Sequence, residues 1–356
     1  MRPWVYCASF LLPLMATAGL CLGGWWAWLT PAFVFLAIPL IDWLLGVSDD
    51  YADRVAQSGS ENSMGRPESA WWSRDGVYTG ILIFQVASQL SLLVVLGHYW
   101  TTQQAEVWER VGWVLSVALS VGGVGITVAH ELVHRQVWWQ RGAGKLMLMG
   151  VLYMHFSIEH VRGHHASVGT SEDAASAPRG MNVYRFLVRT VPLQWWSAWG
   201  LECKRLGKHG RAVWSHHNEM LWFLIFQLLW LVLLTSMFGF AFLPVYLVVA
   251  TLSFGLLEVV NYIEHYGLRR EKGENGRYEA VGPEHSWNSN HRLSRALLFE
   301  LSRHSDHHLH ALKHYQRLAN GERSPQLPSG YPGMVLLALV PPVWFWMMDR
   351  RIEPQS

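Results

Sequence analysis

Histidines gather in three short boxes of this sequence, and imidazole is a common ligand of metal ions in proteins. The boxes span residues 130–134, 160–165 and 304–308 and hold eight histidines: His130, His134, His160, His164, His165, His304, His307 and His308. Residues three or four apart share one face of a helix, so each box can direct two or three imidazoles to one point. Eight donors exceed the four positions of a tetrahedral zinc site, which predicts two metal ions.

A ninth histidine and several carboxylates extend this candidate site. His265 follows a long apolar segment and is a further candidate ligand. Nearby carboxylates can offset the positive charge of an all-histidine site and orient its rings. The candidates for this role are Glu131, Glu258, Glu264 and Asp306, and Glu159, Glu172 and Asp173 also lie near the second box. Glu258 lies inside an apolar segment, where a carboxylate is a functional candidate by default. For the others, exposure to solvent or contact with a neighbouring helix explains them equally well.

The composition indicates an integral membrane protein. Of 356 residues, 51% are hydrophobic, 15% are charged and 21 are tryptophan, which is too apolar for an ordinary soluble enzyme. The formal net charge of +2 gives no reason to expect nucleic-acid binding. The three cysteines stand far apart, so neither a disulfide framework nor an iron–sulfur module is expected.

Six apolar segments approach or exceed the length of about 20 residues that a helix needs to cross a bilayer. They are residues 5–22, 25–45, 77–96, 111–128, 220–240 and 242–263. We therefore predict an all-α membrane protein with six transmembrane helices and a histidine-rich cytoplasmic cap, formed by residues 129–219 and 264–356. The polar stretch 46–75 is expected to be a solvated connector. No repeat or linker divides the chain, so residues 1–356 are expected to form a single domain.

Two further apolar pieces are ambiguous. Residues 146–156 are too few to cross a membrane and suit a buried or re-entrant helix. Residues 334–348 contain Pro341 and Pro342, and we expect this piece on or partly in the membrane surface.

Six crossings place all nine histidines at the same end of the molecule. If the N-terminus is cytoplasmic, the fourth and sixth spans deliver His130 and His265 to the cytoplasmic face, and the other seven histidines follow on that side. The distribution of charge supports this orientation, because all 28 lysines and arginines except Arg110 fall in the predicted cytoplasmic segments. Both termini are therefore predicted to be cytoplasmic.

Metal at this end of an apolar helical bundle suits the oxidation of a hydrocarbon that enters from the lipid. Side chains alone offer no oxidant for an unactivated C–H bond, whereas redox-active iron with O2 does. Zinc has no redox chemistry. The pattern therefore favours iron.

Four stretches resemble those of the membrane-bound alkane 1-monooxygenases, within the fatty-acid desaturase and hydroxylase superfamily. They are residues 159–165 (EHVRGHH), 261–268 (NYIEHYGL), 285–291 (HSWNSNH) and 301–308 (LSRHSDHH). The resemblance implies two non-haem iron ions bound by the nine histidines. It also implies O2-dependent hydroxylation of the terminal methyl of n-alkanes, with electrons from a separate rubredoxin and its NAD(P)H-dependent reductase. A bacterial inner membrane is the expected location.

The sequence departs from the family pattern without losing a candidate ligand. Val133 and Arg135 stand where the first box often has glycine and lysine, and the prolines usual after the second and third boxes are absent. In related alkane hydroxylases, a bulky residue eight positions before an aspartate of the second span limits chain length. The equivalent residue before Asp42 is Val34, which is small. The resemblance therefore implies an open channel for longer alkanes.

Other functions remain open at this point. Within the superfamily they are xylene-type side-chain hydroxylation and fatty-acyl desaturation or hydroxylation. Acyl desaturases commonly have two residues between the first two histidines of the second box, whereas this chain has three between His160 and His164. An intramembrane zinc protease also uses an HExxH helix, with the glutamate as general base, but it would leave six histidines unexplained. A transporter or haem-binding protein should instead have histidines along its spans.

Overall fold

The structure, a computed structural model, describes residues 1–48, 74–321 and 323–352, and its secondary structure there is helical, with isolated bridges and no strand. Six helical segments are long and apolar enough to cross a membrane: Pro3–Leu22, Gly24–Leu45, Asp75–Thr102, Val107–Val133, Glu219–Phe238 and Phe240–His265. The predicted six-span, all-α membrane fold is therefore confirmed. The third and fourth spans are longer than predicted. Most of the predicted connector 46–75 lies outside the described residues.

Several spans change helical type along their length. The first joins a 3-10 stretch, Pro3–Phe10, to α1 (Leu11–Leu22), and the second runs through a 3-10 turn Gly24–Trp28, α2 (Leu29–Ala32), a π turn Phe33–Ala37 and α3 (Ile38–Leu45). The third is α5 (Arg74–Thr102), and the fourth joins α6 (Val107–Leu119), a π turn Ser120–Gly125 and α7 (Ile126–Val133). The last two are α12 (Glu219–Phe238) and, after a 3-10 turn Phe240–Phe242, α13 (Leu243–His265).

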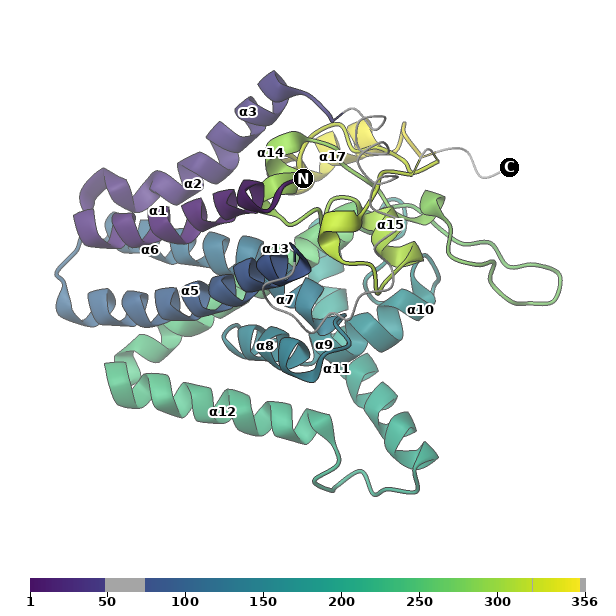
Figure 1. Cartoon of the computed structure of the whole chain (residues 1–356), viewed down its shortest axis with the longest axis horizontal. Helices are drawn as coiled ribbons and strands as arrows, with labels where there is room; N and C mark the ends of the chain where they lie inside the picture. The colour runs from purple at the N-terminus through teal and green to yellow at the C-terminus, as the bar shows by residue number, and fades with distance from the viewer. Residues whose placement is uncertain (49–73, 322, 353–356) are drawn as a thin grey trace.

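The turns between paired spans lie together at one end of the bundle, on the left in Figure 1. Gly23 and Gly239 make two of these turns with φ of 62° and 78°, a backbone conformation that favours glycine. The Glu109 carboxylate accepts a hydrogen bond from the Gly24 amide and so ties the first of these turns to α6. The N-terminus and the histidine-bearing segments lie at the opposite end, as the number of crossings requires.

Helices and a π turn outside the spans form the cap at this second end. They are α8 (Trp138–Met149), α9 (Phe156–Glu159), a π turn His160–His164, α10 (His165–Ser167), α11 (Val183–Lys208), α14 (Arg292–Leu297), α15 (His304–Leu309), α16 (Tyr331–Ala338) and α17 (Pro341–Met348). The helix expected near residues 146–156 begins earlier and ends at Met149, and it packs against α7. The proline pair starts α17 and separates it from α16, which packs against α13. No sequence motif predicts the long helix α11.

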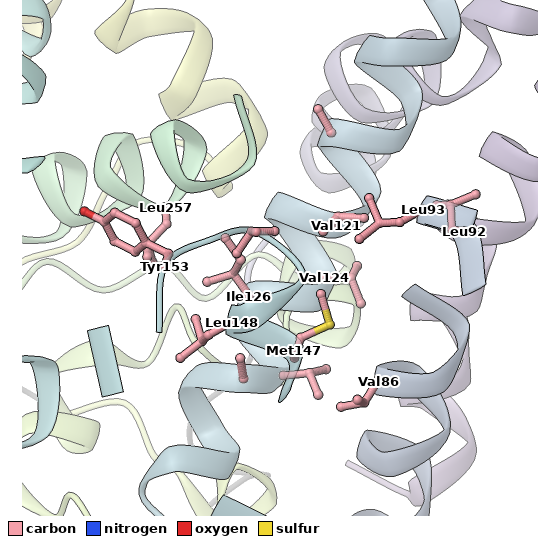
Figure 2. Packing of buried hydrophobic residues seen from close by; sticks show 14 of the residues in the cluster. Val86, Leu92, Leu93, Val121, Val124, Ile126, Met147, Leu148, Tyr153 and Leu257 are labelled. Carbon is pink, nitrogen blue, oxygen red and sulfur yellow. The ribbon is translucent and has the colours of Figure 1, made fainter. Parts of the chain in front are cut away.

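Apolar side chains of the spans and α8 meet in the interior of the bundle (Figure 2). The labelled residues are Val86, Leu92 and Leu93 of α5, Val121, Val124 and Ile126 of the fourth span, Met147 and Leu148 of α8, Tyr153, and Leu257 of α13. All of them are buried. Gly122 permits a close approach of the fourth span to α13, because a Cβ there would lie 2.8 Å from the Ser253 backbone.

Polar contacts fasten the spans to one another and to the cap. Gln85 donates to Ser9 at 2.7 Å, and Ser120 donates to Gln89 at 2.9 Å, so three spans are joined within the apolar interior. The Asp42 carboxylate accepts hydrogen bonds from the Leu293 and Ser294 amides at the start of α14. Asp42 therefore positions a cap helix.

Candidate metal centre

The structure brings all nine predicted histidines together in two groups. His130, His134, His160, His165 and His307 form a five-histidine group, and His164, His265, His304 and His308 form a four-histidine group. Within each group, the candidate ligand nitrogens lie within 4.8 Å of one another. They come from four chain segments: α7, the second box, the end of α13 and α15. Three of these segments contribute to each group.

The spacing of the nitrogens fits metal binding. The Nε2 atom of His165 lies 3.1 Å from that of His160 and 3.0 Å from that of His307. In the other group, the Nε2 atom of His304 lies 3.1 Å from that of His265 and 2.9 Å from that of His308. Two nitrogens bound about 2.1 Å from one ion, at about 90° to each other, would lie about 3 Å apart.

Unpartnered donor atoms support the same conclusion. The Nε2 atoms of His130, His134 and His164 are buried and have no hydrogen-bond partner among the described residues. A buried polar atom without a partner is costly unless something else satisfies it. Because these nitrogens face the same two groups, the donor set fits two metal ions.

Burial also holds six of the nine histidines in the form that binds metal. Burial lowers the pKa of His134 to about 3. It lowers the pKa of His160, His165, His304, His307 and His308 well below the usual value, and neighbouring imidazoles add to the effect. These rings are therefore neutral near pH 7, and the neutral imidazole is the ligand form.

A π turn decides how the second box divides. The His165 amide donates to the His160 carbonyl, five residues back, across the π turn His160–His164. This wider turn brings His165 beside His160, whereas His164 joins the four-histidine group. Each box thus directs two imidazoles to one group, as predicted, while the remaining histidines of the second and third boxes, His164 and His307, join the other group.

Two carboxylates contact candidate ligands. The Nδ1 atom of His164 lies 2.9 Å from Oδ2 of Asp173, which also accepts from the Ser176 hydroxyl at 2.6 Å. The Nδ1 atom of His304 lies 3.2 Å from Oε1 of Glu264. The carboxylate of Glu264 accepts a 2.6 Å hydrogen bond from the Tyr331 hydroxyl. Asp173 therefore orients the His164 ring, and Glu264 lies beside the His304 ring.

The other three carboxylate candidates bond to different partners within the described residues. Glu131 forms a 2.8 Å ion pair with Arg135 and accepts from the Tyr315 amide. Asp306 forms a 2.7 Å ion pair with Lys313. Glu258 accepts hydrogen bonds from four side chains, those of Tyr153, Thr190, Gln194 and Asn261. These three carboxylates therefore fix the surroundings of the groups rather than the rings.

Two further histidines of the cap, His155 and His310, lie outside both groups. His155 is buried and its ring packs against Tyr153, with the centroids 4.3 Å apart. His310 is largely exposed and pairs with Asp306 at 2.8 Å.

An apolar cavity adjoins the two groups. It holds about 830 Å³ of space between atoms, including its open part. One histidine of each group, His130 and His304, lies on its wall, together with Glu264 and Tyr331. The rest is mostly aliphatic and includes Leu12, Val34, Ile38, Leu257 and Val335. The cavity therefore joins both groups to an apolar space between the spans.

Comparison with known proteins agrees with this arrangement. The profile of the fatty acid desaturase family matches residues 106–338, which include all three boxes and His265. Alkane 1-monooxygenase 2 of Pseudomonas aeruginosa is 39% identical over 353 residues, covering 96% of this chain and 90% of the relative. The chain belongs to the alkane 1-monooxygenase family. It is therefore an oxidoreductase.

Two further relatives extend this comparison. Alkane 1-monooxygenase 1 of Pseudomonas aeruginosa is 40% identical over 329 residues, covering 92% of this chain and 83% of the relative. The xylene/toluene monooxygenase hydroxylase component of Pseudomonas putida is 27% identical over 344 residues, covering 96% of this chain and 87% of the relative. The similarity to the alkane 1-monooxygenases is thus the stronger of the two.

Proposed function

We propose that this chain hydroxylates the terminal methyl of n-alkanes to 1-alkanols, with O2 and with electrons from a separate rubredoxin and its NAD(P)H-dependent reductase. The observation that carries the proposal is the cavity whose apolar wall runs to both histidine groups. His130 belongs to one group and His304 to the other, and both line this cavity. A hydrocarbon held there is in reach of both candidate metal sites.

The nine histidines would hold two iron ions, one in the five-histidine and one in the four-histidine group. Iron with O2 supplies an oxidant for an unactivated C–H bond. The imidazoles bring no negative charge to the sites, and the carboxyl groups of Asp173 and Glu264 lie beside His164 and His304. These carboxylates offset part of the positive charge of the ions.

The cavity walls bind and orient the alkane. Each methylene that leaves water for an apolar surface contributes about 0.8 kcal/mol, so a long chain is held without any polar contact. Leu12, Val34 and Ile38 of the first two spans lie on the wall with Leu257 of α13. Because these walls are apolar, they also keep water away from the reacting carbon.

Charge supports a cytoplasmic site in the inner membrane of a bacterium. All but one of the 28 basic residues precede the first span, follow the last or lie in the connections on the histidine side. The exception, Arg110, lies at the opposite end. By the positive-inside tendency, both termini and the histidine cap face the cytoplasm, where reduced rubredoxin is available. The whole chain then acts as one membrane-embedded domain.

The protease alternative is less well supported by the geometry. In such an enzyme, the glutamate of the HExxH helix must be free to act as general base. Here the equivalent residue, Glu131, is engaged by Arg135 and by the Tyr315 amide. The nine histidines of the two groups also exceed the three protein ligands that a single catalytic zinc needs.

Reconstituted turnover tests the proposal. The purified chain, loaded with Fe²⁺ in nanodiscs, is supplied with rubredoxin, its reductase, NADH and single n-alkanes from octane to hexadecane. We expect 1-alkanols, and we expect none from a His304→Ala variant. Parallel reactions with xylene and with a fatty-acyl substrate test the two alternatives within the superfamily. Product from one of these, with no 1-alkanol from any alkane, would refute the proposal.

A further inference from the structure

A second, polar pocket lies in the cap, between segments that follow candidate ligands. It holds about 430 Å³ of space between atoms, including its open part. Residues that follow two ligand-bearing segments form its walls: 169–171 and 176–178 come after the second box, and Leu268 and Arg269 come three and four residues after His265. Arg189 of α11 completes it. We call this the arginine pocket.

The chemistry of the arginine pocket suits an anion. Two guanidinium groups, of Arg189 and Arg269, line it together with the hydroxyls of Thr170, Ser171 and Ser176. No acidic side chain is among its lining residues in the described part of the chain. The Nη1 atom of Arg189 is buried and has no hydrogen-bond partner there. Guanidinium groups bind carboxylates and phosphates with paired hydrogen bonds.

A chain of hydrogen bonds joins this pocket to the candidate metal site. Ser176 lines the pocket, and its hydroxyl donates to Oδ2 of Asp173 at 2.6 Å. The same oxygen lies 2.9 Å from Nδ1 of His164, a member of the four-histidine group. One side chain of the pocket is thus two hydrogen bonds from a candidate ligand. Electron transfer slows steeply with distance, so this is a short route to the metal from the surface.

We propose that the arginine pocket receives a surface carboxylate of the acidic one-electron carrier and so marks where electrons enter. This inference rests on the proposed function, in which each turnover takes two electrons and two protons. Two successive reduced carriers each lose one electron, and O2 and the alkane become the alcohol and water. A protein carboxylate is favoured over a lipid phosphate because only a carrier has use for the hydrogen-bonded route to His164. The surrounding segment 129–218, with 11 basic and 5 acidic residues, would also attract an acidic carrier.

Kinetics with rubredoxin as the carrier test the proposal. Arg189→Gln and Arg269→Gln each remove one charge from the pocket, and Arg269 is exposed, so its replacement leaves the fold intact. We expect each variant to need roughly three- to tenfold more rubredoxin for half-maximal rate. This rubredoxin requirement should also depend less on the salt concentration than it does in the unaltered chain. Arg185→Gln is the matched control, because Arg185 is an exposed arginine one turn earlier on α11 and does not line the pocket. It should shift the rubredoxin requirement by less than about twofold.

A second measurement separates this inference from the proposed function. Enzyme reduced with dithionite and given O2 and octane, without rubredoxin, should form the same amount of 1-octanol in a single turnover in all three variants as in the unaltered chain. No alcohol from the unaltered chain would refute the proposed function itself. If both pocket variants form the normal amount of 1-octanol and their rubredoxin requirement is unchanged, only the proposed role of the arginine pocket would be overturned. The proposal for the arginine pocket would also be overturned if the rate of the unaltered chain responds to phosphatidylglycerol in the nanodiscs and the rates of the pocket variants do not. That result would assign the pocket to a lipid phosphate.

Discussion

Oδ2 of Asp173 lies 2.9 Å from Nδ1 of His164, and this contact joins two residues that belong to different local structures. His164 ends a π turn, whereas Asp173 lies in the irregular segment before α11. Two further hydrogen bonds, from the Ser176 hydroxyl and the Ala175 amide, hold the Asp173 carboxylate in place. The carboxylate therefore fixes the ring of a candidate ligand from a rigid position.

Replacing Asp173 by asparagine should weaken metal binding. The amide keeps the shape of the side chain but loses the charge that orients the His164 ring, and loss of such a partner typically costs roughly 10- to 100-fold in metal affinity or activity. We expect a lower iron content by elemental analysis and a matching fall in 1-alkanol formation. Glu172→Gln is the control, since Glu172 is exposed next to it. Full iron content in Asp173→Asn would show that the contact is dispensable.

Removing one histidine from either group should cost one ion and not both. His165 belongs to the five-histidine group and His308 to the four-histidine group. We expect His165→Ala and His308→Ala each to retain about one iron per chain, compared with about two in the unaltered chain, because the groups use separate donors.

His155→Ala is the matched control for this experiment. His155 is a buried histidine of the same cap but lies outside both groups. Its replacement should leave the iron content unchanged. Loss of both ions from each of the single-group variants would contradict two separable sites.

The size of residue 34 should set the longest alkane that reacts. Val34 is buried on the wall of the apolar cavity. Val34→Trp would fill part of this space, so we expect hexadecane to react much less while octane is retained. Product ratios across an alkane series measure this effect. Leu36→Trp is the control, because Leu36 lies in the same π turn but is 70% exposed. Identical ratios in Val34→Trp and the unaltered chain would refute the role of Val34.

Glu258 should stabilise the fold through its hydrogen bonds. The Tyr153 hydroxyl donates to its Oε1 at 3.0 Å, and the Gln194 amide donates to its Oε2 at 2.7 Å. Glu258→Ala leaves these buried donors unpaired, at about 1–3 kcal/mol for each. We expect a lower thermal unfolding midpoint in detergent, and a smaller decrease for Glu258→Gln. Glu274→Ala makes the same change on an exposed loop and should have no effect. An unchanged midpoint in Glu258→Ala would argue against the network.

The sequence alone predicted much of the scaffold because its signals are local. A bilayer span is a run of apolar residues, and each of the six runs corresponds to a span in the structure. The even number of crossings before His130 and His265 then requires both to lie at one end, where the structure has them. The length of α11 and its place in the cap left no comparable signal, because its sequence has neither an apolar run nor a clear amphipathic period.

The division of the nine histidines could be decided only by the tertiary structure. Helical spacing predicted that His160 and His164 would share a face, but the π turn between them sends the two rings to different groups. A π turn has no sequence signature that spacing alone reveals, because packing around it holds the extra residue in the turn. The partners of the rings likewise depend on packing. Asp173 reaches His164 across a loop, and Tyr331 reaches Glu264 from a helix 67 residues away.

The residue types and the apolar runs thus determined that this is a membrane protein with nine imidazoles gathered at one end. Only the folded chain decided which imidazoles share an ion site, which carboxylates orient them and which distant side chains enclose the cavity. The physical reason is that composition and periodicity act over one or two helical turns. The cavity, in contrast, joins Leu12, Val34, His130 and Tyr331, which meet only when the spans and the cap pack together.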